Sequence, residues 1–149
     1  MTATLAAPAR AVFLAPALPA SVPALRAEVT ARLTAWGLDL GLIADVALAL
    51  TEMLTNALTH GGAEELDLRL TLDHGRLLVE VDDQFLYPPY PVRQCALEPG
   101  DPDLGLVDTD GRGVFLVEML ADAWGCRIVR DDPARGVVGV KTVFAEFSV

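Results

Sequence analysis

Residues 51–83 read TEMLTNALTHGGAEELDLRLTLDHGRLLVEVDD, and the spacing of the apolar side chains changes once along this stretch. Its first part continues an apolar pattern with the 3.6-residue period of a helix, which we expect to begin near Asp39 and to stop at Gly61-Gly62. Leucines then alternate with polar side chains, which is the two-residue period of a strand with one buried face. His74-Gly75 predicts a tight turn into a returning strand. The stretch therefore predicts a long helix followed by an antiparallel hairpin.

An edge strand and a shorter helix are expected before the long helix. The strand falls near residues 11–14. The shorter helix has Ser21 as its expected N-cap and Gly37 as its expected C′ residue. The long helix is apolar nearly all round over residues 42–50, which predicts burial on most of its sides.

A third helix and two strands are expected after the hairpin. The helix follows residues 111–113 and ends at the Ala-Trp-Gly of residues 123–125, which repeats residues 35–37 and is interpreted as a second helix C-terminus. Strands follow near residues 126–130 and 137–147. The predicted fold class is α+β, a two-layer sandwich with three main helices on one face of a mixed, largely antiparallel sheet, in one domain.

The composition describes a compact and acidic protein. The 149 residues carry 21 acidic and 11 basic side chains, a formal net charge of −10, and 52% of them are hydrophobic. That hydrophobic fraction excludes a disordered chain, and the length suits one core. An anionic surface repels a phosphate backbone, so we expect no nucleic-acid partner. No uncharged apolar run reaches the about 18 residues that span a bilayer, so we expect no membrane partner and a cytoplasmic location.

Three polar side chains in the second half of the long helix are candidates for chemistry. Glu52, Asn56 and His60 are spaced by four residues, which brings a carboxylate, a carboxamide and an imidazole to one helix face. A carboxamide oxygen is a hard, neutral ligand for Mg²⁺, and a carboxylate one turn away suits a general base. The alternative interpretation is a solvated helix face.

Asp83 and Thr142 are candidates for recognition of a nucleobase. Asp83 continues the core-facing row of the returning strand, where a carboxylate without a partner is costly. A buried aspartate accepts a hydrogen bond from an exocyclic amine, which distinguishes adenine from guanine; alternatively, Asp83 caps a turn. Thr142 would hydrogen-bond near the same base, although threonine in a strand is usually explained by its β propensity.

A long segment without periodicity precedes a glycine-flanked helix start. Residues 84–110 are rich in proline and acidic side chains, and such long segments in compact domains are usually functional or disordered. The run Asp110-Gly111-Arg112-Gly113 then opens a helix. Its glycines allow the backbone to approach a polyphosphate, and the first helical amides point at it. Glycines of a flexible loop are the alternative.

In this order and at these separations, the features resemble the GHKL ATP-binding domain (the Bergerat-type fold) shared by gyrase, histidine kinases and mismatch-repair ATPases. The resemblance covers about residues 11–147 and is closest to the small stand-alone anti-sigma factors with serine-protein kinase activity. Its most specific parts are the run from Thr51 to His60 and the GRGVFLV of residues 111–117. It implies ATP and Mg²⁺ as cofactors and residues about 84–110 as an ATP lid.

The resemblance also implies roles for individual residues. Asn56 would hold Mg²⁺, Asp83 would bind the adenine amino group, and Glu52 would be the base that activates a partner serine. The other nucleotide-binding residues that it implies are His60, Gly111, Arg112, Gly113, Val114 and Thr142.

Three functions are compatible with this resemblance. The first is partner switching, in which the protein phosphorylates a serine of a small anti-anti-sigma antagonist and sequesters a sigma factor; a homodimer is compatible with it. The second is a degenerate module with weak or no nucleotide binding that regulates by protein contact alone. The run Asp83-Gln84-Phe85, where the family has Asp-x-Gly, favours the second. An ATPase is a third reading, with Arg112 as the nearby cation for a γ-phosphate.

Overall fold

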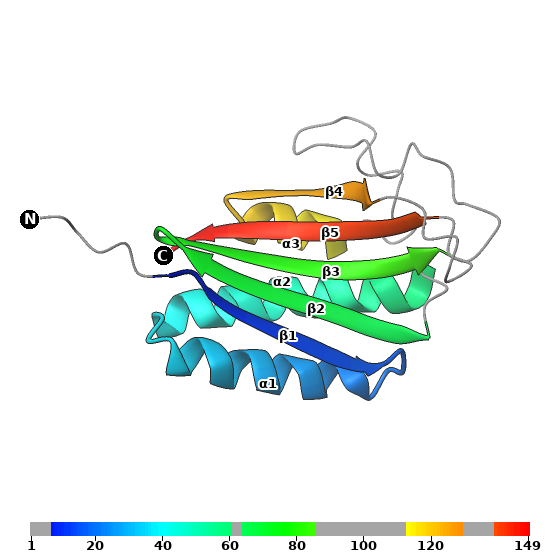
Figure 1. The fold of residues 1–149 in the computed structure, drawn as a ribbon, viewed down its shortest axis with the longest axis horizontal. Coiled ribbons are helices and arrows are strands. Elements are labelled where there is room, and N and C mark those ends of the chain that lie inside the picture. The colour runs from blue at the N-terminus through cyan, green and yellow to red at the C-terminus, as the bar shows by residue number, and fades with distance from the viewer. Residues whose placement is uncertain (1–6, 61–63, 86–112, 130–138) are drawn as a thin grey trace, which may run out of the picture.

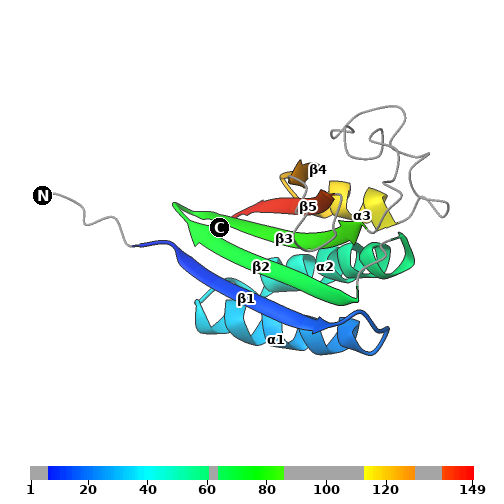
Figure 2. The same cartoon turned by 45° about the vertical axis from the view of Figure 1, so that its right-hand side comes forward.

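The computed structural model describes residues 7–60, 64–85, 113–129 and 139–149. Within these ranges, three helices cover one face of a five-stranded sheet (Figures 1 and 2), which confirms the predicted α+β class. The elements are β1 (Ala9–Pro16), α1 (Ser21–Ala35), α2 (Leu40–His60), β2 (Glu65–Asp73), β3 (Arg76–Phe85), α3 (Gly113–Leu120), β4 (Ala123–Val129) and β5 (Gly139–Ser148).

The strands follow the order β1-β2-β3-β5-β4, and each neighbouring pair that the structure describes is antiparallel. The predicted β2–β3 hairpin is confirmed: His74 and Gly75 form its turn with φ of 47° and 74°, the positive values of a type I′ turn. β3 pairs with β5 up to Phe85, which lies opposite Gly139. Gln84 and Phe85, predicted to begin the lid, are therefore strand residues, and the rest of the predicted lid lies outside the described residues.

The core lies between the helices and the sheet. Figures 1 and 2 agree that α1 runs along β1, α2 lies beneath β2 and β3, and α3 lies beneath β5. The alternation predicted for the hairpin is confirmed, because its inward side chains are almost fully buried. The main core side chains are Leu66, Leu68, Leu70, Leu77, Val79 and Val81 of the hairpin, Leu25, Val29 and Leu33 of α1, Val46, Leu50 and Leu54 of α2, Val117 of α3, and Ala145 and Phe147 of β5.

Helix α1 ends as predicted. Gly37 has a φ of 77°, which favours glycine because it has no Cβ. Its amide donates to the Thr34 carbonyl at 2.9 Å, and the Leu38 amide donates to the Leu33 carbonyl at 3.2 Å. This pair of hydrogen bonds is a Schellman motif, which reverses the chain toward α2.

The start of α1 differs from the prediction. Ser21 is the first helical residue, and the N-cap is Ala20, which has helical dihedral angles and makes no side-chain capping bond. The reason lies in the preceding turn, where the Ser21 amide already donates to the Leu18 carbonyl at 2.9 Å. Ser21 is therefore the first residue of the helix and does not occupy the N-cap position.

Helix α2 is capped by a carboxylate and ends at His60, as predicted. Asp39 Oδ2 accepts hydrogen bonds from the amides of Gly41, at 2.9 Å, and Leu42, at 3.3 Å. These bonds satisfy two of the amides that a helix start leaves without a partner, and the negative charge is favourable there.

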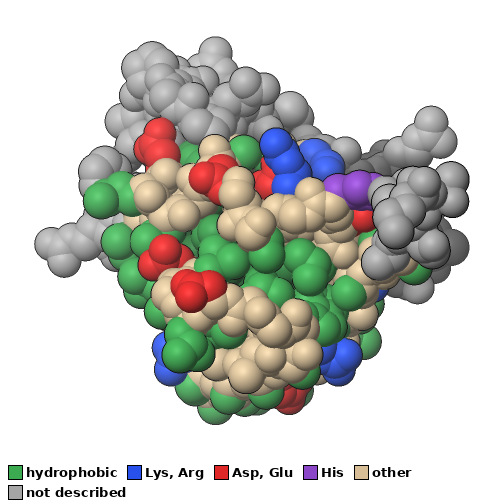
Figure 3. Space-filling view, turned by 90° about the vertical axis from the view of Figure 1, so that its left-hand side faces the viewer, with side chains coloured by type: hydrophobic (Ala, Val, Ile, Leu, Met, Phe, Trp, Pro, Cys, Tyr) green, Lys and Arg blue, Asp and Glu red, His purple; other side chains and the backbone are tan. Residues whose placement is uncertain are grey.

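The first half of α2 is less buried than predicted. Within the predicted range 42–50, Leu48 is 44% exposed, and Leu40, just before this range, is 77% exposed. In the described part of the chain, the sheet and the two other helices pack against the remaining sides of α2. Figure 3 views the end of the molecule at which α2 begins, where hydrophobic side chains gather at the surface. By length and composition alone, Leu40–Thr59 matches a membrane span, with a mean hydropathy of 1.4. Its inner side packs against the sheet, which is the arrangement of a core helix.

The second Ala-Trp-Gly run is not a helix C-terminus, so this prediction is wrong. Helix α3 ends at Leu120, and Ala123 begins β4 opposite Glu146 of β5. Gly125 serves a close approach instead, because a Cβ at this position would lie 3.0 Å from Cζ of Phe144. Residues 123–125 are therefore a strand because they pair with β5, although their sequence is identical to that of residues 35–37 at the end of α1.

The Asp39 cap gives a prediction for stability. We expect Asp39→Ala to lower the free energy of unfolding by about 1 kcal/mol, because two helix amides lose their acceptor. Asp39→Asn keeps a side-chain oxygen at the same place and is the matched control, with a smaller loss. Urea denaturation measures both. Equal stabilities for the two variants would contradict the capping role.

Candidate functional site

Glu52 and Asn56 lie on the flank of α2 that is turned away from α1. Thr51 marks the opposite flank, because its hydroxyl accepts a hydrogen bond from Arg26 of α1 at 3.3 Å. At about 100° per residue, Glu52 and Asn56 lie about 100° and 140° round the helix from Thr51. Helix α3 packs on this side of α2, and both side chains are half-buried. The structure therefore brings the predicted carboxylate and carboxamide together at the junction of α2 and α3.

Strand β3 carries two consecutive aspartates, and its pairing places positions 82 and 83 in rows on opposite faces of the sheet. Val79 and Val81 are buried beneath the helices, so position 83 continues the helix-facing row. Asp82 lies on the outer face, where it contacts Arg69 of β2. The register thus places position 83 on the side of the sheet where α2 lies.

Several predicted residues cannot be compared in full with the structure. Gly113 is the first residue of α3, as its predicted role requires. The side chains of His60, Asp83 and Val114, and all of Gly111 and Arg112, lie outside the described part of the chain, so their roles stay predictions.

Thr142 does not lie where it was predicted. Ala145 and Phe147 of β5 are buried against the helices, so the two-residue period places Thr142 on the outer face. Its hydroxyl donates to Oδ1 of Asp82 at 2.7 Å, and the residue is only 1% exposed. The prediction that Thr142 lines the adenine site is therefore wrong. In the register of β5, Lys141 is opposite Asp83 on the helix-facing row.

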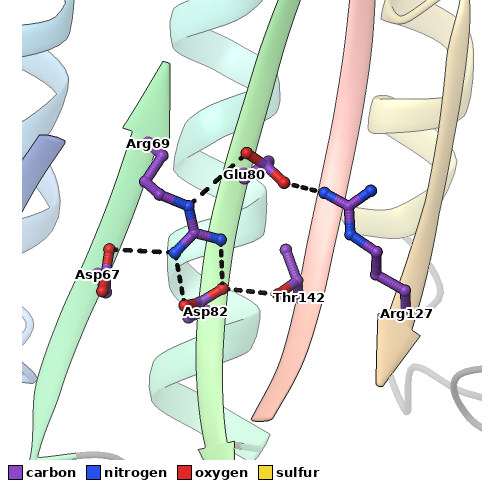
Figure 4. Close-up of polar contacts among 6 residues, drawn as sticks. All are labelled: Asp67, Arg69, Glu80, Asp82, Arg127 and Thr142. Carbon is purple, nitrogen blue, oxygen red and sulfur yellow. Dashed lines mark hydrogen bonds and ion pairs between the residues drawn. The ribbon is translucent and has the colours of Figure 1, made fainter. Parts of the chain in front are cut away.

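Six side chains form a polar cluster on the outer face, which we call the outer cluster (Figure 4). Its centre is Arg69, whose guanidinium donates to both carboxylate oxygens of Asp82, at 2.6 and 2.8 Å. Such a two-pronged ion pair fixes the geometry more firmly than a single contact. Helix α2 lies behind the sheet in this view, so the cluster and the helices are on opposite sides. The members are Asp67, Arg69, Glu80, Asp82, Arg127 and Thr142.

The outer cluster links four strands. Arg69 Nε of β2 lies 3.7 Å from Glu80 of β3. Arg127 of β4 reaches over β5 and donates to the other oxygen of Glu80. On the way, its guanidinium carbon lies 5.3 Å from the centroid of the Phe144 ring, a cation–π distance. The cluster thus connects β2 to β4 without using the helices.

Asp67 is the least well compensated charge in the outer cluster. Burial raises the pKa of the Asp67 carboxyl, and the nearby charge of Asp82 raises it further, against a smaller opposing effect of Arg69. Arg69 Nη1 is 3.5 Å from Asp67 Oδ1, close enough for an ion pair, but this buried oxygen makes no hydrogen bond among the described residues. The hydrogen bond to Asp82 raises the pKa of Arg69, whose charge is therefore secure.

Sequence reasoning missed the outer cluster, although a signal was present. The polar positions of the hairpin were identified as the outward row, and the His74-Gly75 turn fixes their register. Counting back from the turn places Arg69 opposite Glu80 and Asp67 opposite Asp82, as observed. Pairing of these charges across the hairpin was therefore available from sequence; the contribution of β4 and β5 was not.

Comparisons with known proteins agree with this architecture. A family model described as the histidine kinase-like ATPase domain matches residues 15–141. No curated protein matches the chain.

Two solved structures are similar to it. The structure of the RsbU and RsbW domains of Rv1364c from Mycobacterium tuberculosis has a TM-score of 0.62 at 19% identity; the match covers 94% of this chain and 32% of that one. The chain thus spans about a third of that protein. The SiaB–SiaC complex from Pseudomonas aeruginosa has a TM-score of 0.64 at 14% identity, covering 92% and 89% of the two chains. At these identities the likeness shows the fold alone.

The raised pKa of Asp67 gives a prediction for the pH dependence of stability. Since the folded pKa lies above the unfolded value of about 3.9, the ionised carboxylate costs stability at higher pH and costs nothing below that value. We expect Asp67→Asn to have a higher Tm than the parent at pH 7 and an equal Tm near pH 3, measured by calorimetry. Asp45→Asn, which removes an exposed carboxylate from α2, is the control. A lower Tm for Asp67→Asn at pH 7 would contradict the assignment.

Proposed function

Because this chain belongs to the histidine kinase-like ATPase domain family, we propose that it binds ATP with Mg²⁺ and phosphorylates a serine or threonine of a partner protein. The observation that carries the proposal is the placement of Glu52 and Asn56 on the α3 side of α2, on the same side of the sheet as position 83. A nucleotide bound between these elements would meet a base-reading carboxylate, a magnesium ligand and a general base.

The adenine would be read by Asp83 and not by its neighbour. Asp82 accepts three hydrogen bonds on the outer face, two from Arg69 and one from Thr142, so its carboxylate is already engaged. Of the two aspartate positions, only position 83 belongs to the helix-facing row of β3. A carboxylate there accepts a hydrogen bond from the 6-amino group of adenine and rejects the 6-oxo group of guanine.

Mg²⁺ would be held by Asn56 together with the phosphates of ATP. Among the described residues, no group of three His, Cys, Asp or Glu side chains could hold a metal ion by itself. A neutral carboxamide suits an ion that keeps most of its coordination for phosphate oxygens and water. The half-buried Asn56 fits this demand, and a bound Mg²⁺ would neutralise phosphate charge.

Glu52 would act as the general base one helical turn before Asn56. In the proposed reaction, the proton of the partner's hydroxyl passes to the Glu52 carboxylate while its oxygen bonds to the γ-phosphorus. The bond from the γ-phosphorus to the bridging oxygen breaks, and ADP leaves. Positioned general bases contribute about 10²–10⁴-fold to such steps.

The partner would be a protein released by its own phosphorylation. The SiaB–SiaC structure is itself a complex of two proteins, which supports a protein partner. In the proposed switch, a small antagonist is phosphorylated, and a sigma factor is the protein that this chain then sequesters. A phosphoserine adds about −1.5 to −2 charges at pH 7. This protein carries a net charge of −10, so the modified partner would be repelled and the contact weakened.

A second candidate is a module that regulates by protein contact without nucleotide. One observation favours it: β3 continues as a regular strand through Gln84 and Phe85, which pair with Val140 and Gly139. The backbone after Asp83 is thus engaged with β5, where the family's Asp-x-Gly would leave it close to a nucleotide. Binding of Mg-ATP decides between the two candidates.

Substitution of Asp83 tests the nucleotide assignment. We expect Asp83→Asn to bind Mg-ATP at least about tenfold more weakly than the parent, because it loses a charge-assisted hydrogen bond to the adenine amine. Isothermal titration calorimetry measures the affinity, and circular dichroism checks the fold. The control is Asp73→Asn at the hairpin end of the sheet, which should bind like the parent. Unchanged affinity in Asp83→Asn would refute the adenine assignment.

Substitution of Glu52 separates binding from transfer. Glu52→Ala should bind Mg-ATP like the parent. It should transfer labelled γ-phosphate at least about 100-fold more slowly to a partner protein that co-purifies with the parent from its native host, because the base is missing. Glu28→Ala, which removes an exposed carboxylate from α1, is the matched control and should keep the parental rate. Parental transfer by Glu52→Ala would exclude Glu52 as the base.

A further inference from the structure

The carboxylate of Asp82 connects three strands, directly to the opposite Thr142 of β5 and diagonally to Arg69 of β2. Arg69 of β2 donates to both of its oxygens, and Thr142 of β5 donates to Oδ1 at 2.7 Å. The contacts are partly shielded from water, since the side chains of Arg69 and Asp82 are 31% and 15% exposed and Thr142 is 1% exposed. Shielded, charge-assisted hydrogen bonds are stronger than those of exposed ion pairs.

These contacts lie directly behind the proposed base-reading position. Asp82 opposite Thr142 and Asp83 opposite Lys141 are successive rungs of the β3–β5 ladder. Only two further rungs follow before β3 ends at Phe85. Strand ends open locally at small cost in free energy, so a side-chain anchor near this end restricts the backbone that carries Asp83.

Within the outer cluster, the carboxylates of Asp82 and Glu80 are satisfied by other members of the cluster. Each oxygen of Asp82 is used within the cluster, and Glu80 is shared between Arg69 and Arg127. Position 83 lies in the β3–β5 ladder, and the outer cluster also contacts β2 and β4, the strands on either side of this ladder. These contacts therefore support a role in holding the β3–β5 ladder in place from the outer face.

We propose that Arg69 and Thr142, acting through Asp82 on the outer face, are positioning residues that hold Asp83 in place for recognition of the adenine amino group. This inference rests on the proposed nucleotide binding. A positioning role differs from general stabilisation in one measurable way: it acts on the discrimination between bases. Mg-ADP offers Asp83 a 6-amino donor, whereas Mg-IDP offers a 6-oxo acceptor and gains nothing from a well-placed carboxylate.

The outer face supplies a matched control. Arg76 and Glu146 form an ion pair between the same two kinds of side chain at 2.7 Å, also across neighbouring strands. This pair lies at the hairpin end of the sheet, and Arg76 is 67% exposed. Its removal takes one arginine from the same face without touching the rungs next to position 83.

The test measures the affinities of Mg-ADP and Mg-IDP in the parent and in Arg69→Met, Thr142→Val and Arg76→Met, by calorimetry below each Tm. We expect Arg69→Met and Thr142→Val to bind Mg-ADP about tenfold more weakly and Mg-IDP within twofold of the parent. Arg76→Met should change neither. Thr142→Val removes only a hydroxyl, so it remains informative if Arg69→Met does not fold.

Two results would overturn the proposal, and they are distinguishable from failure of the proposed function. If the variants lose affinity for both nucleotides equally, or for neither, the outer cluster is structural and the positioning role is wrong while nucleotide binding stands. If the parent itself does not bind Mg-ADP, or does not prefer it to Mg-IDP, the proposed function fails and this inference fails with it.

Discussion

The two-residue period of β3 is the constraint on which the account of this protein depends. Because successive positions of a strand belong to opposite faces of the sheet, positions 82 and 83 fall in different rows. Asp82 enters a shielded ion pair with Arg69 on the outer face, and position 83 joins the row that faces the helices. A slip of one residue in the register would exchange these environments and would also turn the buried Val79 and Val81 outward. Burial of the hairpin's apolar side chains therefore also decides which of the two positions belongs to the helix-facing row.

Helix α2 supplies the other half of the proposed site by the same logic of periodicity. Its buried side chains face the sheet and fix the rotation of the helix about its axis, and the hydrogen bond from Arg26 of α1 to Thr51 agrees with this rotation. Glu52 and Asn56 then have to lie on the α3 flank. The proposed site thus follows from the packing of α2 against β3, since each has polar positions next to its buried apolar side chains. The outer cluster connects the strands on the opposite face of the sheet.

Much of this fold was predictable because its centre is built from strong local signals. The hairpin turn at His74-Gly75, the end of α1 at Gly37 and the extent of α2 follow from glycine conformation and apolar spacing, and all three are confirmed. The interpretation of Ala123-Trp124-Gly125 is wrong because pairing with β5, a long-range contact, decides that segment. The face of Thr142 was missed for a related reason. The sequence of β5 does not show which face is buried, because three successive residues, Val143, Phe144 and Ala145, are all apolar. In the structure, Phe144 lies on the outer face, where Arg127 covers its ring, and Ala145 is buried beneath the helices.

The most direct measurement is a crystal structure of the complex with Mg-ADP, which locates the base relative to the sheet. The account predicts adenine on the helix side, between β3 and α2, with its 6-amino nitrogen within about 2.7–3.2 Å of the Asp83 carboxylate. A base bound on the outer face, or one on the helix side whose amino group makes no contact with Asp83, would contradict it.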